Sequence, residues 1–381
     1  MHAKARSSER HFLYRYLMNG VGRSHRSEKS QGEKVNHYGR YIWRITIFDW
    51  QGLLIFSQVT NIILLLKFSS SVQVSGKVLV CDSIDQVGID SMKRAGLTVH
   101  YKPDIRPAEL VSSVKDYDVL VVRSRTKVTE EVVDAAIQAK IIARVGVGLD
   151  NIDVKAAEMK NIRVINAPEA ASIAVGELVI GLMISLARSI PKADAETKRG
   201  NWIKKDLMGT QLSGKYLGIV GVGNIGRNIG RMAKALRMNL VGYDPYPINR
   251  EFISETGMIV TDLNTLLESA DFVTCHVPAT PETKHMFNSE RLAKMKPTAY
   301  LINTSRGDVI DENALYEVLK SGKLAGAALD VFEVEPPANK QLMNLTNLVC
   351  TPHIGAQTKE AQELASRVIA EKVIQILRGV I

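Results

Sequence analysis

Gly218-Ile-Val-Gly-Val-Gly-Asn-Ile-Gly226 is the stretch that decides the fold of this chain. An apolar run from Tyr216 to Val220 leads into three glycines spaced Gly-x-Gly-x-x-Gly, and a helical pattern follows through Met238. The first glycine permits a tight turn, the second lets a pyrophosphate approach the backbone, and the third lets helix and strand pack closely. Free N–H groups at the helix start then face the anion. This pattern predicts a dinucleotide-binding turn.

A carboxylate follows the second strand of this unit. The run Asn239–Tyr243 is typical of a strand and leads directly to Asp244. A carboxylate there accepts hydrogen bonds from two ribose hydroxyls and repels a 2′-phosphate. The three glycines alone are weak evidence, but strand, turn, helix, strand and acid in register are strong. We therefore predict NAD rather than NADP, bound at Gly221, Gly223, Asn224, Ile225, Gly226 and Asp244.

The composition is that of an ordinary globular protein. The chain has 381 residues, 45% apolar and 23% charged, which is enough for two domains with real cores. Its three cysteines, Cys81, Cys275 and Cys350, lie far apart and show no metal-ligand spacing. We therefore expect no metal site, no disulfide framework and a reducing, cytoplasmic location.

The net charge of +9 is concentrated at the N-terminus. Residues 1–76 hold 11 Lys/Arg against 4 Asp/Glu, which leaves 38 against 36 for the rest. The apolar stretch Leu53–Leu66 is too short and too polar for a membrane span. We predict a disordered tail or a non-native start rather than a targeting or nucleic-acid-binding arm, and hence neither nucleic acid nor membrane as a partner.

From Lys77 onward, strand-like runs alternate with helical patterns, which predicts an α/β fold of two doubly wound Rossmann-like domains with a cleft between them. We expect a discontinuous substrate domain at 77–171 and 356–381, and an NAD-binding domain at 172–355. The expected strands are Lys77–Val80, Leu97–His100, Val119–Val122, Ile141–Val145, Arg163–Ile165, Gly218–Val220, Leu240–Tyr243, Gly257–Val260, Phe272–His276, Tyr300–Asn303 and Gly326–Asp330. The expected helices include Ile84–Ala95, Pro107–Val114, Thr129–Gln138, Ala174–Ala187 and Thr358–Arg378.

Three chemically capable side chains follow strand-like runs of the second domain. Arg306 offers a planar fork for a carboxylate, and Glu335 and His353 could form a proton-exchanging pair. Taken singly, each is more typical of a surface cation, a solvated loop carboxylate or a turn histidine. His276 is a rival base that ends an apolar strand. Spacing alone does not choose between them.

Residues 77–381 resemble the NAD-dependent D-2-hydroxyacid dehydrogenases and, within that family, the phosphoglycerate dehydrogenases. The matching motifs occur in the family's order. They include Val122-Arg-Ser-Arg-Thr-Lys-Val128, Gly146-Val-Gly-Leu-Asp-Asn-Ile-Asp153, Asn166-Ala-Pro168, the dinucleotide turn, His276-Val-Pro278, Asn303-Thr-Ser-Arg-Gly-Asp308, Gly326-Ala-Ala-Leu-Asp-Val-Phe332 and Thr351-Pro-His-Ile-Gly355.

The resemblance places the catalytic triad on Arg306, Glu335 and His353, and Glu335 stands where formate dehydrogenases carry an amide. It implies that Arg306 and the N–H groups of Val147 and Gly148 hold the substrate carboxylate, and that His353 takes the C2 hydroxyl proton. Glu335 would orient the imidazole. The resemblance also implies cofactor contacts from His276, Pro278, Thr304 and Asp330, the last to the nicotinamide carboxamide.

For the substrate, the resemblance implies oxidation of D-3-phosphoglycerate, the first step of phosphorylated serine synthesis. Arg123, Ser124 and Arg144 would then serve the phosphorylated substrate. The alternatives are a glyoxylate or hydroxypyruvate reductase, which needs no phosphate site, and an NADH-sensing scaffold like the C-terminal-binding-protein corepressors. One departure is Glu169-Ala170-Ala171-Ser172, where the family often has Asn before the serine.

Family members usually pair through the NAD-binding domain, which implies a homodimer, and the apolar segment Ala174–Ala187 would supply a contact. The chain ends soon after its last predicted helix. The long phosphoglycerate dehydrogenases continue into a serine-sensing domain, so we expect no feedback inhibition of that type.

Overall fold

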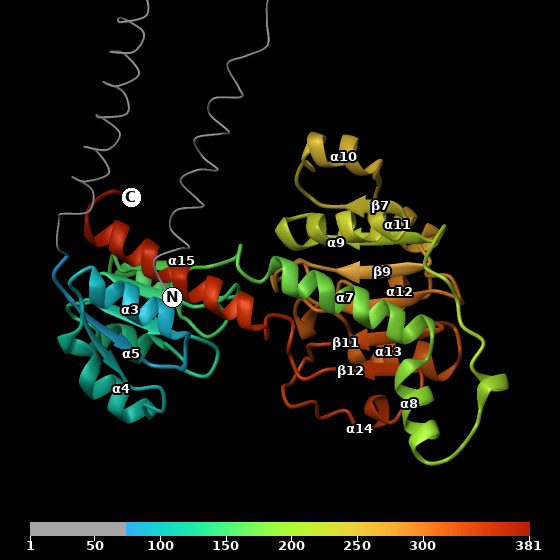
Figure 1. The fold of residues 1–381 in the computed structure, drawn as a ribbon, viewed down its shortest axis with the longest axis horizontal. Coiled ribbons are helices and arrows are strands. Elements are labelled where there is room, and N and C mark those ends of the chain that lie inside the picture. The colour runs from blue at the N-terminus through green and yellow to red at the C-terminus, as the bar shows by residue number, and fades with distance from the viewer. Residues whose placement is uncertain (1–73) are drawn as a thin grey trace, which may run out of the picture. The chain divides into compact units, whose positions relative to one another are not determined.

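A computed structural model describes residues 74–381, so the predictions for the basic N-terminal extension fall outside the described residues. The described part contains two all-parallel sheets with helices on both faces (Figure 1). This confirms the predicted α/β, doubly wound class.

The first sheet has five strands in the order β2-β1-β3-β4-β5. Because the order reverses between β1 and β3, loops diverge at the carboxyl ends of these two strands, where such sheets bind ligands. The strands are β1 (Lys77–Val80), β2 (Thr98–Tyr101), β3 (Val119–Val122), β4 (Ile141–Arg144) and β5 (Arg163–Asn166). Its helices are α3 (Gln86–Arg94), α4 (Pro107–Ser113), α5 (Glu130–Ala135), α6 (Val154–Met159) and α15 (Lys359–Leu377), with a 3₁₀ turn η1 (Val114–Asp116).

The second sheet has seven strands in the order β12-β11-β10-β9-β6-β7-β8, with its reversal between β6 and β9. The strands are β6 (Tyr216–Val220), β7 (Asn239–Tyr243), β8 (Ile259–Val260), β9 (Phe272–Cys275), β10 (Tyr300–Asn303), β11 (Gly326–Leu329) and β12 (Leu348–Cys350). Its helices are α7 (Ser172–Ala187), α8 (Ile190–Lys198), α9 (Asn224–Ala235), α10 (Arg250–Thr256), α11 (Leu263–Ser269), α12 (Ser289–Leu292), α13 (Glu312–Lys320) and α14 (Lys340–Met343), with 3₁₀ turns η2 (Lys204–Asp206) and η3 (Gly307–Val309).

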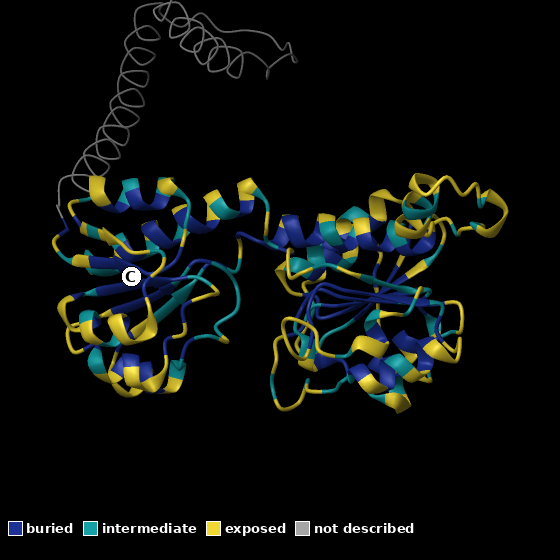
Figure 2. Cartoon of the chain, turned by 90° about the horizontal axis from the view of Figure 1, so that it is seen from below, coloured by how far each residue is buried: buried dark blue, intermediate teal, exposed yellow. Residues whose placement is uncertain are grey.

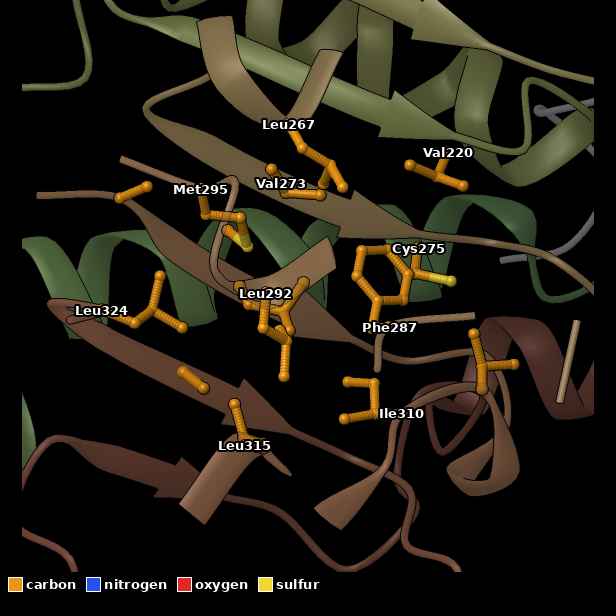
Figure 3. Close-up of a cluster of buried hydrophobic side chains, with 14 of the residues drawn as sticks. Val220, Leu267, Val273, Cys275, Phe287, Leu292, Met295, Ile310, Leu315 and Leu324 are labelled. Carbon is orange, nitrogen blue, oxygen red and sulfur yellow. The ribbon is translucent and has the colours of Figure 1, made fainter. Parts of the chain in front are cut away.

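Each sheet separates two apolar cores, because its strands are buried on both faces (Figure 2). On β10, for example, Leu301 enters the core that contains Phe287 and Leu292, whereas its neighbour Ile302 enters the core on the other face. Figure 3 shows the first of these cores, which contains Phe287, Leu292 and Leu315. Doubly covered strands explain the continuous apolar runs in the sequence.

The C-terminal helix α15 packs beside α3 of the first sheet (Figure 1). The two helices approach so closely that a Cβ at Gly88 would lie 2.6 Å from the Ser366 carbonyl oxygen. Ser366 also donates a hydrogen bond to the Asp85 carbonyl at 2.8 Å. The chain therefore passes between the sheets twice, once after β5 and once after β12, and the predicted domain boundaries lie in these connections, where they stay predictions.

Several predicted element ends are wrong by one to three residues. The helix expected over Thr129–Gln138 is observed as α5, which ends at Ala135 because Ala136 leaves the helical conformation and Ile137 is exposed. The strand expected to begin at Gly257 begins at Ile259, since Gly257 adopts a left-handed conformation that caps α10. The helix expected from Ile84 begins after Asp85, whose side chain caps it by accepting the Val87 N–H.

No single helix within residues 74–381 is long and apolar enough to cross a membrane. The bent pair α7 and α8 meets the length and composition criteria together, but α7 packs most of its apolar side chains into the core of the second sheet. Over the same residues, no group of three or more His, Cys, Asp or Glu side chains could hold a metal ion.

Candidate active site

Three neighbouring strands deliver the predicted triad to one edge of the second sheet. Arg306 follows β10, Glu335 lies between β11 and α14, and His353 follows β12. Since β10, β11 and β12 are adjacent and parallel, their carboxyl ends meet at one edge. Residues that are far apart in the sequence therefore gather where doubly wound sheets bind ligands.

Glu335 and His353 form a direct pair. The two carboxylate oxygens of Glu335 lie 2.8 and 3.1 Å from Nδ1 of His353. One of them also accepts the Phe332 N–H at 3.3 Å, which fixes the carboxylate on its own loop. A carboxylate on Nδ1 places a proton there and leaves Nε2 to exchange protons with a ligand. The pair has the arrangement of an oriented acid–base histidine.

The turn that carries His353 is held by Asp330, which is fully buried. Oδ1 of Asp330 accepts the Thr351 hydroxyl at 2.6 Å and the Ile354 N–H at 2.8 Å, while Oδ2 accepts the Gly355 N–H at 2.8 Å. His353 itself has a left-handed backbone, with φ of +53°, which is costly for a residue with a side chain. Asp330 thus has a clear task in shaping this turn, and its predicted contact to a nicotinamide carboxamide stays a prediction.

Asn303 organises the turn that carries Arg306. Its buried amide donates to the Arg306 carbonyl at 2.8 Å, and its Oδ1 accepts the Ser305 N–H and hydroxyl at 3.0 and 2.8 Å. Gly307 is required next in the chain, because a Cβ there would collide with the Phe332 carbonyl. The missing side chain at Gly307 thus allows the loop after β10 to lie directly against the loop after β11.

The loop after β4 supplies backbone donors beside Arg306. Within residues 74–381, the N–H groups of Val147 and Gly148 donate to no protein acceptor. A Cβ at Gly148 would lie 2.9 Å from the Arg306 Cζ and closer still to Nη2, so the guanidinium lies directly against this glycine. The Asn166 amide donates to the Val147 carbonyl, which turns the opposite side of this peptide toward β5. The structure therefore places Gly148 and its neighbour Val147 beside Arg306, and their binding of a substrate carboxylate stays a prediction.

Two further predicted residues, Arg123 and Arg144, also lie at strand ends of the first sheet. Arg144 ends β4 and donates to no acceptor within the described residues, and its Nε is buried. Burial lowers the pKa of Arg144, and the charge of Arg306 lowers it further. Arg123 donates to the side chain of Gln357, which lies just before α15. Ser124 is exposed beside Arg123.

Arg125 has a different fate, although it stands in the same motif. Its guanidinium donates to the carbonyls of Cys81 and Pro103 at 2.6 Å and pairs with Asp82 at 3.1 Å. The buried Asp82 also accepts the Arg123 N–H and the Thr126 hydroxyl. The hydrogen-bond donors of Arg125 are therefore used within the loop, whereas Arg123 and Arg144 remain available to a ligand.

The glycine turn after β6 fits a dinucleotide. A Cβ at Gly221, where φ is +89°, would lie 2.5 Å from the His276 carbonyl, and one at Gly226 would collide with the Gly221 carbonyl. By contrast, a Cβ at Gly223 would meet nothing within 4 Å, so this glycine faces open space at the start of α9. Asn224 and Ile225 form the first turn of that helix, whose free N–H groups suit a pyrophosphate.

Asp244 follows β7 and is fixed by two backbone donors, Val222 N–H at 2.8 Å and Tyr246 N–H at 2.9 Å. Each carboxylate oxygen keeps further acceptor capacity for a ribose hydroxyl. On the other side of the turn, the Thr304 hydroxyl and Nδ1 of His276 are buried polar atoms without partners in the described structure. Pro278, two residues after His276, is exposed. Orphaned polar atoms beside an open glycine turn are what a bound NAD would satisfy.

His276 is excluded as a general base near neutral pH. Burial lowers the pKa of His276 to about 3, so the ring is neutral at physiological pH. Its Nε2 lies 2.8 Å from the hydroxyl of Thr274, which is part of β9. The sequence left His276 and His353 as rivals, and the environments of the two rings separate them.

Sequence reasoning missed Asp150 and Asn303 as site residues. Asp150 lies in the quoted motif Gly146-Val-Gly-Leu-Asp-Asn-Ile-Asp153, and its Oδ2 lies 2.9 Å from Nη2 of Arg306. Its partner stands 156 residues away, so no local pattern could have revealed the pair. At the departure from the family pattern, Ala171 stands directly before Ser172 and is buried in the core of the second sheet.

Comparison with known proteins agrees with this geometry. Residues 180–355 match the family model "D-isomer specific 2-hydroxyacid dehydrogenase, NAD binding domain". The chain is 49% identical to the D-3-phosphoglycerate dehydrogenase of Methanocaldococcus jannaschii over 304 residues, which is 80% of this chain but only 58% of that protein. It is 47% identical to the hydroxypyruvate reductase of Thermotoga maritima over 274 residues, 71% of this chain and 88% of the relative.

Solved structures give the same result. The D-lactate dehydrogenase of Aquifex aeolicus, complexed with NAD and lactic acid, superimposes with a TM-score of 0.70 at 28% identity, and the match covers 80% of this chain and 96% of that one. The predicted cofactor, NAD, is thus confirmed, and the chain belongs to the family of D-isomer-specific 2-hydroxyacid dehydrogenases.

Proposed function

We propose that this protein interconverts D-3-phosphoglycerate and 3-phosphohydroxypyruvate with NAD, the first step of phosphorylated serine synthesis. The observation that carries the proposal is the Glu335–His353 pair at 2.8 Å, with Arg306 on the neighbouring strand end. The phosphoglycerate dehydrogenase of Methanocaldococcus jannaschii, at 49% identity, supports the choice of substrate.

The residues of the site have separate roles in binding the substrate and in proton transfer. Arg306 and the free N–H groups of Val147 and Gly148 bind the substrate carboxylate, because a guanidinium fork and two backbone donors match its oxygens. Nε2 of His353 accepts the proton of the C2 hydroxyl in oxidation and returns it to the carbonyl oxygen in reduction. Glu335 holds the ring through Nδ1 and stabilises the charge that the ring acquires.

The NAD-binding residues would hold the cofactor in a fixed orientation. Gly221, Gly223 and the start of α9 would face the pyrophosphate, and Asp244 would accept the ribose hydroxyls. Bound NAD supplies the acceptor for the hydride that leaves C2. Asp244 also disfavours a 2′-phosphate, because its charge would lie against another anion.

Arg144 supports a phosphorylated substrate. Its guanidinium lies half-buried beside Arg306 without any acceptor in the described structure, which is an unfavourable state that an anion relieves. Gly146 makes this position possible, since a Cβ there would lie 2.8 Å from the Arg144 Cζ. Arg123, at the end of the neighbouring strand, supplies a second cation.

A hydroxypyruvate reductase is the second candidate. The Thermotoga maritima hydroxypyruvate reductase is matched over 88% of its length, more than the phosphoglycerate dehydrogenases are. Such an enzyme would use the same triad but would have no need for Arg144. The two candidates therefore differ in substrate and in the consequence of losing this arginine.

We also propose a homodimer formed through the NAD-binding domain. Residues 190–208 support this, because α8 contains no buried residue and Trp202 and Met208 are 84% and 95% exposed. Apolar side chains of this size are favourable when a partner covers them. The apolar face of α7, which the sequence suggested for this contact, is instead used within the chain's own core. A cytoplasmic location is supported by the free state of Cys81, Cys275 and Cys350.

The test is NADH oxidation by the purified protein with 3-phosphohydroxypyruvate, hydroxypyruvate and glyoxylate compared side by side. A higher kcat/KM for the phosphorylated acid, lost in Arg144→Ala, is the expected result. Equal or better turnover of the unphosphorylated acids, with no effect of Arg144→Ala, would move the protein to the reductase candidate.

A further inference from the structure

Arg306 is already engaged by a carboxylate of this chain. Its Nε donates to Oδ2 of Asp150 at 3.0 Å, and its Nη2 lies 2.9 Å from the same oxygen. Nη1 donates to the Ser305 carbonyl at 2.6 Å. Asp150 comes from the loop after β4, whereas Arg306 follows β10, so this pair joins loops that belong to different sheets.

The donor count shows what this pair leaves free. A guanidinium carries five N–H groups in a rigid plane. Asp150 takes the edge formed by Nε and Nη2, and Ser305 takes one N–H of Nη1. One N–H therefore remains on each terminal nitrogen, and these two groups can donate to the oxygens of a carboxylate. Asp150 does not compete for these two groups, because it occupies the edge formed by Nε and Nη2.

The charges around Arg306 also explain why a carboxylate is needed at Asp150. The charge of Arg306 helps to lower the pKa of Arg144, and both arginines help to lower the pKa of Asp150. Burial raises the pKa of Asp150, but the hydrogen bond and charge of Arg306 outweigh it and keep the carboxyl ionised at neutral pH. A fixed negative charge between two guanidinium groups prevents them from moving apart before an anionic ligand arrives.

We propose that Asp150 is a positioning residue that orients the Arg306 guanidinium, so that its two remaining N–H groups and those of Val147 and Gly148 receive one carboxylate. This rests on the proposed function, because it assigns that carboxylate to a 2-oxo or 2-hydroxy acid. Asp150 touches neither the reacting carbon nor the proton that His353 exchanges, so its effect is on binding and alignment of the acid.

The experiment compares Asp150→Ala and Asp150→Asn with a matched control, Asp134→Ala, in the full chain. Asp134 pairs with Lys160 at 2.9 Å and its side chain is 59% exposed, close to the 60% of Asp150, but Lys160 lies outside the site. An Asn at 150 keeps an oxygen that can accept from both Nε and Nη2, whereas Ala keeps none.

Asp150→Ala is expected to lower kcat/KM for hydroxypyruvate about 10- to 100-fold, mostly through KM, with KM for NADH within about twofold of the unmodified enzyme. Asp150→Asn is expected to recover most of this loss, and Asp134→Ala to match the unmodified enzyme. A merely structural role would lower the melting temperature and affect both substrates alike. Wild-type kinetics in Asp150→Ala would overturn the proposal.

Binding of oxamate to the NADH-loaded protein separates this proposal from the proposed function. Oxamate carries a carboxylate next to a carbonyl, so calorimetry measures the carboxylate pocket without turnover. A Kd raised about tenfold or more in Asp150→Ala but not in Asp134→Ala supports the role of Asp150 even if no 2-oxo acid is reduced. An unchanged Kd overturns it, and absence of oxamate binding and of turnover in the unmodified protein would overturn both.

Discussion

Replacing Gly148 by Ala should disable the carboxylate pocket while leaving the fold intact. A Cβ at this position would lie 2.9 Å from the Arg306 Cζ, whereas carbon atoms in contact normally stay about 3.5–4.0 Å apart. The guanidinium must therefore move by roughly 0.6 Å or more, and Nη2, which lies closer, by a larger amount. Gly148 has no positive φ, so the added methyl group causes this displacement without backbone strain.

A misplacement of about 1 Å in a substrate-positioning group costs about 10²-fold in rate, which corresponds to about 2.7 kcal/mol. We therefore expect kcat/KM for hydroxypyruvate or its phosphorylated form to fall by about this factor in Gly148→Ala, with KM for NADH unchanged. The measurement is the initial rate of NADH oxidation, followed by the absorbance of the reduced cofactor at about 340 nm.

Gly181→Ala is the matched control. Gly181 is exposed on α7, and a Cβ there would meet nothing within 4 Å. Alanine at such a helical position should stabilise the protein by about 0.5–1 kcal/mol and leave the kinetics unchanged. If Gly148→Ala kept kcat/KM within about threefold of the control, the assignment of Arg306, Val147 and Gly148 to one carboxylate pocket would be refuted.

Three further predictions concern proton transfer, cofactor choice and acid stability. His353→Asn should lower kcat about 10²–10⁴-fold without changing KM for NADH, and initial rates test this; an unaffected kcat would remove His353 from the mechanism. Asp244→Ala should narrow the preference for NADH over NADPH by about tenfold or more, measured as the ratio of the two kcat/KM values, and a constant ratio would contradict the ribose assignment. His276 has a folded pKa of about 3 against 6.5 for the free group, so below pH 6.5 the unfolded chain binds the extra proton first and stability falls. Between pH 7 and pH 5 this proton uptake lowers the free energy of unfolding by about 2 kcal/mol. Urea unfolding at both pH values should therefore show a smaller loss of stability for His276→Gln than for the unmodified protein. An equal loss would argue against the buried, neutral ring.

Much of the fold could be predicted because its strands are buried on both faces. Val119–Val122 and Tyr300–Asn303 were predicted with the bounds that the structure has, since continuous apolar runs have few alternatives to a central strand. Element ends were harder to predict, because caps decide them. α3 begins where Asp85 accepts a backbone N–H, and Gly257 ends α10 where the pattern suggested a strand.

α8 was not predicted, and the reason is physical. Its sequence Ile190–Lys198 buries no residue against the rest of the described chain, so it lacks the apolar stripe that marks a helix packed on a core. The sequence signal for such an exposed helix comes only from local propensity, which is weak.

The positions of the triad residues could be predicted as strand-end residues, but their roles depended on family resemblance. The structure shows hydrogen-bond partners that residue spacing alone does not reveal. Asp330 appears in the sequence as the last residue of an apolar run, yet it is fully buried and holds the left-handed turn of His353. Likewise, Arg125 and Arg123 look equivalent in the sequence, and only the carbonyls around Arg125 show that it is structural.

The central claim is that this site moves a hydride between a nicotinamide cofactor and C2 of a D-2-hydroxy acid, while His353 handles the proton. The most direct test is reduction of 3-phosphohydroxypyruvate and hydroxypyruvate with NADH deuterated at the transferring position, followed by mass and chiral analysis of the products. The account predicts one deuterium at C2 and only the D-isomer. A product without the label, or a mixture of isomers, would contradict it.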